Sequence, residues 1–181
     1  MPLQKIQIVI VAALLFTTAV AARAEREEYE LILWNQFNGA AKDRGTKACK
    51  IEAFSGASVI WKADRLEIPW NAGADTKASV KIPKQISTIE RIRITILETI
   101  GSGGGLSEIE LFRGDTNLAR DCKVSASRFF HNDQRFSPER VIDGITSSQT
   151  MFVGYWLLPD SKPGAKTENR PDWIELKLPR K

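Results

Sequence analysis

The chain has 181 residues, of which 26 are lysine or arginine and 22 are aspartate or glutamate, giving a formal net charge of +4. That length suggests one domain with a hydrophobic core of its own. No block of lysine and arginine is interleaved with aromatic residues, which argues against a nucleic-acid-binding protein.

Residues 1–24 have the pattern of a secretory signal peptide. Lys5 supplies a positive start, Ile6–Val20 an apolar core, and Ala22-Arg23-Ala24 an A-x-A cleavage pattern. The apolar run is shorter than the roughly 20 residues of a membrane span, so we expect cleavage, with a retained anchor as the alternative. Cleavage removes Lys5 and Arg23 and no acid, which lowers the net charge from +4 to +2. We expect a secreted protein, periplasmic or extracellular, with no membrane insertion after cleavage.

Alternating apolar and polar residues predict short strands through the first half of the chain. The strongest signal is Thr88–Thr99, where Ile92, Ile94 and Ile96 share one face. The turn Ser55-Gly56 suggests that two of the earlier segments form a hairpin. The other predicted strands are 29–35, 47–54, 57–62, 76–82 and, more weakly because of its proline, 66–70.

The middle of the chain holds two alternating runs joined by the polar turn Arg113–Asn117. Ile109 and Leu111 share a face before the turn, and Cys122 and Val124 share one after it. Beyond them we expect an aromatic-rich loop over 128–136, one helical turn at 137–140, an irregular segment over 147–170 and a last strand over 173–178. About eight short strands, no long helix and no repeat indicate an all-β sandwich of antiparallel strands.

Cys49 and Cys122 lie on the apolar faces of predicted strands. In an oxidising compartment they could form a disulfide, or they could remain buried thiols. The sequence leaves both open, because it does not show whether their Cα atoms come within roughly 7 Å.

Several segments resemble the discoidin family. These are the coagulation factor V/VIII C-type, galactose-binding-like domains, also found as family 32 carbohydrate-binding modules. Residues 117–127 (NLARDCKVSAS), 136–148 (FSPERVIDGITSS) and 173–178 (WIELKL) resemble the first half of that domain. Residues 31–35 (LILWN), 47–54 (KACKIEAF), 90–96 (ERIRITI) and 103–112 (GGGLSEIELF) resemble its second half. Here the second half comes first.

The resemblance implies that residues 25–181 form a single, circularly permuted discoidin-like jelly roll. Residues 25–114 would be the family's second half and 115–181 its first half. Chain ends often lie close together, which makes permutation tolerable. The alternative is a piece of a tandem array within a larger secreted protein. A signal peptide directly before Glu25 favours permutation, since an exported half-domain would expose a sheet edge.

The resemblance also implies a structural calcium ion, which prefers six to eight oxygen ligands, including backbone carbonyls. The alternative is that Asp143 only caps a turn and Glu108 is a solvated carboxylate. The matching positions are the Asp143 carboxylate, the carbonyls of Arg140 and Ile145, Ser148, and Ser107 with Glu108.

The family's ligand patch lies on loops at one end of the sandwich. Sugar recognition needs flat apolar faces and hydrogen-bond donors for hydroxyl groups. The candidates are Asn38, Arg44, Phe130, His131, Asn132, Arg135 and Trp156. Trp156 lies in the apolar run YWLLP, so core packing is the competing interpretation for it.

We expect a non-catalytic module that binds carbohydrate or a glycoconjugate. The sequence has one histidine, His131, no G-x-S-x-G motif and no cysteine–histidine zinc spacing. The alternative is a structural or protein-interaction domain without a sugar site. The sequence leaves the oligomeric state open.

Overall fold

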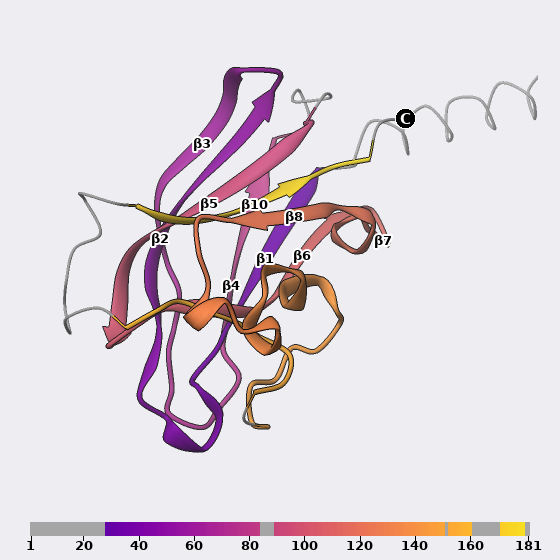
Figure 1. Cartoon of the computed structure of the whole chain (residues 1–181). Helices are drawn as coiled ribbons and strands as arrows, with labels where there is room; N and C mark the ends of the chain where they lie inside the picture. The colour runs from indigo at the N-terminus through magenta and orange to yellow at the C-terminus, as the bar shows by residue number, and fades with distance from the viewer. Residues whose placement is uncertain (1–27, 84–88, 151, 161–170, 180–181) are drawn as a thin grey trace, which may run out of the picture.

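The computed structural model describes residues 28–83, 89–150, 152–160 and 171–179, which form two antiparallel sheets packed face to face (Figure 1). Sheet A has the order β4-β1-β6-β7, with β9 paired to β6. Sheet B has the order β3-β2-β5-β10-β8. The predicted all-β sandwich is confirmed. The expected signal segment lies outside the described residues.

The strands are β1 (Tyr29–Asn35), β2 (Arg44–Ser55), β3 (Ser58–Glu67), β4 (Lys77–Ile82), β5 (Arg91–Gly101), β6 (Gly105–Arg113), β7 (Thr116–Asn117), β8 (Lys123–Ala126), β9 (Trp156–Leu157) and β10 (Asp172–Lys177). The short 3-10 helices are η1 (Gly39–Ala41), η2 (Ala119–Asp121), η3 (Phe130–Asn132), η4 (Gln134–Phe136) and η5 (Pro138–Ile142). Within the described ranges, no helix has the length and apolar character needed to cross a membrane.

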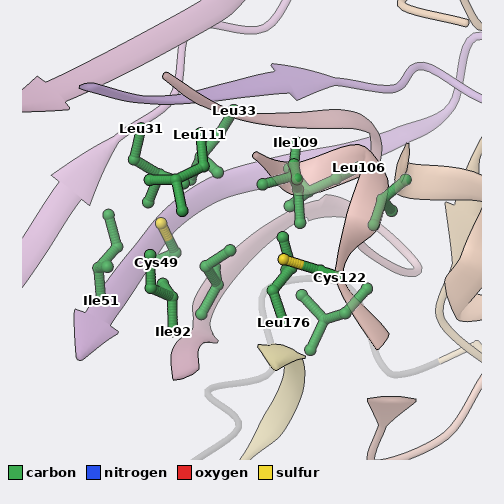
Figure 2. Packing of buried hydrophobic residues seen from close by; sticks show 14 of the residues in the cluster. Leu31, Leu33, Cys49, Ile51, Ile92, Leu106, Ile109, Leu111, Cys122 and Leu176 are labelled. Carbon is green, nitrogen blue, oxygen red and sulfur yellow. The ribbon is translucent and has the colours of Figure 1, made fainter. Parts of the chain in front are cut away.

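Most strands form where the alternation predicts them, because every second side chain is buried. Two expectations are wrong: residues 66–70 are not a separate strand, since β3 runs on to Glu67, and β9 lies within the segment 147–170 that was expected to be irregular. In β1 the side chains of Leu31 and Leu33 are fully buried, and in β5 the same holds for Ile92, Ile94 and Ile96. Figure 2 shows the inward side chains of both sheets meeting in one apolar cluster. Burying a side chain of this kind contributes about 1.5–3 kcal/mol, so this cluster is the main source of stability.

Segments from both halves of the chain build each sheet. In sheet B, the C-terminal strand β10 lies between β5 and β8. In sheet A, β6 pairs with β1 on one side and with β7 and β9 on the other. Leu31 and Leu33 of β1 belong to the same core cluster as Ile174 and Leu176 of β10. The turn after Arg113 therefore lies inside one packed unit, between β6 and β7.

Both cysteines are free and buried. Cys49 lies on β2, and Cys122 directly precedes β8, with β5 and β10 between those two strands. Three inter-strand spacings of about 4.8 Å separate them by roughly 14 Å, twice the Cα separation that a disulfide spans. Burial raises the pKa of Cys49 to about 12 and that of Cys122 to about 11. Both thiols therefore pack as small apolar side chains (Figure 2).

We expect neither thiol to react with Ellman's reagent in the native protein, and both to react after unfolding in guanidinium chloride. The physical reason is that reaction requires an accessible thiolate, which burial disfavours at both sites. The count of reactive thiols by absorbance tests this. Fewer than two reactive thiols in the unfolded, unreduced protein would contradict the separation of the two cysteines.

Candidate functional site

The loop between β1 and β2, residues 36–43, is anchored by Asn35 at the end of β1. The Asn35 side-chain oxygen accepts hydrogen bonds from the backbone N–H groups of Gln36 (3.1 Å) and Thr46 (3.0 Å). Its amide nitrogen donates to the carbonyl oxygens of Thr46 (2.7 Å) and Pro69 (2.9 Å). Asn35 is 2% exposed, so water does not compete for these bonds. They fix both ends of the loop.

Asn38 and Arg44, two of the predicted ligand residues, are tied together through Asp43. The Asn38 amide donates to Asp43 Oδ1 (2.8 Å), and Arg44 Nε donates to the same oxygen (3.2 Å). Arg44 Nη1 also donates to Asp160 Oδ1 (2.6 Å), and its guanidinium lies 5.8 Å from the centre of the Phe130 ring. Arg44 therefore joins the first loop to two segments from the other half of the chain.

Four aromatic rings form a second cluster beneath these loops. Phe136 lies 5.5 Å from Phe130, 5.6 Å from Phe152 and 5.5 Å from Tyr155, measured between ring centres. The Tyr155 hydroxyl donates to Asn38 Oδ1 (3.4 Å) and accepts from the Phe152 N–H (3.1 Å). The cluster thus connects the loops 36–43, 128–136 and 149–155 at one end of the sandwich.

Phe152 and Arg135 make the exposed part of this cluster. The Phe152 side chain is 40% exposed, and the Arg135 guanidinium lies 4.5 Å from its ring centre. Arg135 also donates from Nε to both oxygens of Asp133 (3.0 and 2.9 Å). An apolar ring beside a positioned guanidinium presents a flat face and hydrogen-bond donors to the same side of the molecule.

The structure brings together all of the predicted ligand residues except Trp156. His131 and Asn132 are exposed beside Phe130, at positive φ angles of 52° and 54°. Trp156 is fully buried in the main core, and its Nε1 donates to the carbonyl of Arg128 (3.1 Å). Its proposed role in ligand contact is wrong, because pairing between β9 and β6 turns the ring inward.

An open hollow of about 320 Å³ adjoins the first loop. Its lining comes from the loop 36–43, the turn after β3 and the segment before β9, which explains why no local pattern predicts it. Sequence reasoning missed two of its polar residues, Lys42 and Gln149, and also missed Phe152. A signal was available only for Phe152, an aromatic residue two positions before Gly154 in a segment that was expected to be irregular. The lining residues are Phe37, Gly39, Ala40, Lys42, Gly73 and Gln149.

Glu108 is the most deeply buried acid of the predicted calcium site. Its side chain is 1% exposed, so the alternative interpretation of a solvated carboxylate is wrong. Both carboxylate oxygens accept from the backbone N–H of Gly144, at 3.1 and 3.2 Å. Gly144 has a φ of 88°, and a Cβ there would lie 2.5 Å from Nη2 of Arg120, so glycine is required at this position.

The other residues of the predicted calcium set lie on the segment that Glu108 contacts or beside it. The Ser107 hydroxyl donates to the carbonyls of Asn35 (3.0 Å) and Thr146 (2.8 Å). The Ser148 hydroxyl, fully buried, accepts from the N–H of Phe37 (2.9 Å). The segment 143–148 is therefore bonded to β6 through Ser107 and to the first loop through Ser148.

Asp143 faces this region with Arg140 and Ile145. Asp143 Oδ1 accepts from the Ile145 N–H (2.9 Å), as a turn-capping aspartate does, and Oδ2 lies 3.8 Å from Arg140 Nη1. The Ile145 side chain is a hydrocarbon without a donor atom, so only its backbone oxygen could be a metal ligand.

Glu108 and Asp143 are both costly to ionise, chiefly because of burial. Burial raises the pKa of Glu108 to about 8, and the neighbouring charges of Asp143 and Glu110 add to the effect. Burial also raises the pKa of Asp143. Among the described residues no lysine or arginine nitrogen makes an ion pair with Glu108. A cation at this position would remove both penalties.

The donor chemistry fits a hard cation with few acidic ligands. The described part of the chain holds no group of three or more histidine, cysteine, aspartate or glutamate side chains suited to a metal. A transition-metal site of that kind is therefore not formed by these residues. Calcium sites rely largely on carbonyl and hydroxyl oxygens, and the Ser107 hydroxyl and the Thr146 carbonyl, which bond each other beside Glu108, are oxygens of this kind.

Comparison with known proteins yields no match: no family model fits the chain, and neither curated proteins nor solved structures include a significant relative.

We expect the metal-free protein to lose stability as the pH rises from about 4.5 to about 8. Glu108 keeps its proton in the folded state up to about pH 8, whereas the unfolded chain releases it near its ordinary pKa. Thermal melts in chelator at pH 5 and pH 8 measure the effect. Glu108→Gln should melt a few degrees above the wild type at pH 8, since 1 kcal/mol shifts Tm by about 2–4 °C. Equal pH dependence in both proteins would contradict the burial of an ionisable Glu108.

Proposed function

We propose that this chain is an exported, non-catalytic carbohydrate-binding module, a circularly permuted discoidin-like domain stiffened by calcium. The observation that carries the sugar-binding part is the exposed Phe152 ring beside the Arg135 guanidinium. Flat apolar rings pack on the C–H face of a sugar, and nearby donors bond its hydroxyl groups.

The permutation is supported by how the two halves pack. Strands β8 and β10 come from residues 115–181, and β10 pairs directly with β5 from residues 25–114. The start of β1 and the end of β10 lie at the same end of the sandwich, so in an unpermuted domain the chain could run directly from the counterpart of β10 into that of β1 (Figure 1). Halves of two tandem domains would have no reason to share one core.

Calcium would be held by Glu108, Asp143 and the oxygens of the segment 143–148. When bound, it would neutralise the buried Glu108 and the neighbouring Asp143 and stiffen the segment beside the first loop. The support is electrostatic: two neighbouring carboxylates have raised pKa values and Glu108 has no ion-pair partner among the described residues. Its role here is structural, as the loops that it braces carry the sugar-binding side chains.

For the sugar site, we expect Phe152→Ala to weaken glycan binding about tenfold, because it removes the exposed apolar face while the core beneath remains. The measurement is a glycan array followed by titration of the best ligand. Val59→Ala, which removes a side chain of similar exposure from the β2–β3 hairpin, is the matched control and should bind like the wild type.

Failure of the wild type to bind any glycan would overturn the carbohydrate assignment. The alternative is then a protein-interaction domain. One observation favours it: three exposed apolar side chains, Ile145, Phe152 and Val153, lie within nine residues of sequence.

For calcium, we expect the wild type to melt roughly 5–10 °C higher in calcium than in chelator. A ligand at 100 times its Kd stabilises by about 2.7 kcal/mol, and 1 kcal/mol corresponds to about 2–4 °C. Glu108→Gln should lose the shift, and Glu139→Gln, an exposed acid on the neighbouring η5, should retain it. Magnesium, which prefers strict octahedral geometry, should not replace calcium. If the melting temperature of the wild type does not depend on calcium, the proposed calcium site is wrong.

A further inference from the structure

The outer face of sheet B carries a row of cations that no linear pattern reveals. Lys177 of β10 lies directly opposite Arg91 of β5 on one side and opposite Lys123 of β8 on the other. All three point away from the core, since their neighbours Ile92 and Leu176 point into it. Neighbouring strands lie about 4.8 Å apart, so the three charges span about 10 Å across the sheet.

Two residues further along β5 and β10, the outward-facing pair consists of one cation and one acid. Glu175 of β10 lies opposite Arg93 of β5, and its Oε2 accepts from Arg93 Nε (2.9 Å) and from Arg91 Nη1 (2.9 Å). Where β5, β10 and β8 pair, four cations thus face one acid. Lys123 and Lys177 are exposed, and neither has an ion-pair partner among the described residues.

On the neighbouring strands β2 and β3 the described outward lysines have acidic partners, including Lys47, which pairs with Glu98 of β5. On β2, Lys50 pairs with Glu52 (2.8 Å), and on β3, Lys62 pairs with Asp64 (2.9 Å). The excess of three positive charges is therefore confined to one side of sheet B. Like charges directly opposite each other destabilise a sheet, so the row of cations is not explained by folding.

Two aromatic rings hold the arginines of this region in position. The Arg91 guanidinium lies 4.1 Å from the centre of the Phe54 ring, and the Arg93 guanidinium lies 4.5 Å from that of Trp173. Cation–π contacts of this kind reduce the freedom that each arginine would lose on binding a ligand. We name Arg91, Arg93, Lys123 and Lys177 the basic face.

We propose that the basic face binds an acidic polysaccharide, whose sulfate or carboxylate groups pair with two positioned arginines and two free lysines. Arg91 and Arg93 share Glu175 and so add one net positive charge to the face, while the two lysine ammonium groups can bond sulfate or carboxylate directly. A row of cations along an open sheet surface suits an extended chain lying across the strands. This site is separate from the loops 36–43, 128–136 and 149–155 and does not depend on the sugar site proposed there.

Other polyanions fit the basic face less well. Single-stranded nucleic acids stack their bases on open aromatic rings, but Phe54 is 8% exposed beneath Arg91. Protein partners usually fill apolar pockets, and among the described residues the exposed large apolar side chains lie at 145–153, apart from Val59.

The test compares two double variants that each remove two positive charges. Lys123→Gln with Lys177→Gln alters the basic face, whereas Lys62→Gln with Lys81→Gln alters exposed lysines on β3 and on β4 of the other sheet. Binding to heparin (sulfated), polygalacturonate (carboxylated) and a DNA duplex is titrated at several salt concentrations. All four lysines are exposed, and unchanged melting temperatures would confirm that both variants fold.

We expect the basic-face variant to bind heparin or polygalacturonate about tenfold more weakly, with a shallower dependence on salt, and the control to stay within twofold of the wild type. Fewer cation contacts displace fewer counterions, which reduces the salt slope. The polysaccharide that binds with the higher affinity shows whether the face prefers sulfate or carboxylate groups. Equal loss in both variants, no polysaccharide binding near physiological salt, or preferential binding of the duplex would each overturn the proposal. Phe152→Ala should leave polysaccharide binding to the basic face unchanged. The result for the basic face is therefore independent of the result for the proposed sugar site on the loops.

Discussion

The structure depends on the C-terminal strand β10, which lies inside sheet B. It pairs with β5 and β8 at once and buries Ile174 and Leu176 in the common core. Without it, two sheet edges would be left unpaired and β8 would lose its only partner in the sheet. Strand β10 therefore joins segments from both halves of the chain into sheet B, whereas β4, β1 and β6 of sheet A pair without it.

Strand β10 also helps to position the loop 128–136 of the proposed sugar site and the basic face. Asp172 at its start is 4% exposed and bonds Arg128 through Nε (2.6 Å) and Nη2 (2.9 Å). This bidentate pair fixes the beginning of the loop 128–136, which carries the aromatic end of the proposed sugar site. At the other end of β10, Lys177 joins the cations of its neighbours. A rigid scaffold of this kind allows loops and faces to vary without loss of the fold.

The candidate sites could be predicted only in part. The contact of Glu108 with the Asp143-Gly144 turn follows from the family resemblance, and the two segments do meet. Trp156 was misassigned because an aromatic residue in an irregular segment looks the same whether it faces water or core. Lys42, Gln149 and Phe152 were missed because the hollow and the aromatic cluster are made of segments far apart in sequence. The basic face was missed for the same reason, since its cations come from three strands.

The sequence by itself determined which segments are strands and which of their faces is buried. Period-two alternation is a local property, and an inward row of apolar side chains needs only a second sheet to cover it. Only the tertiary structure decided which strands are neighbours, and hence that Cys49 and Cys122 stay apart, that Glu108 is buried, and that Arg91, Lys177 and Lys123 align. Strand order depends on pairing between distant segments, and the alternation of each strand is compatible with many such orders.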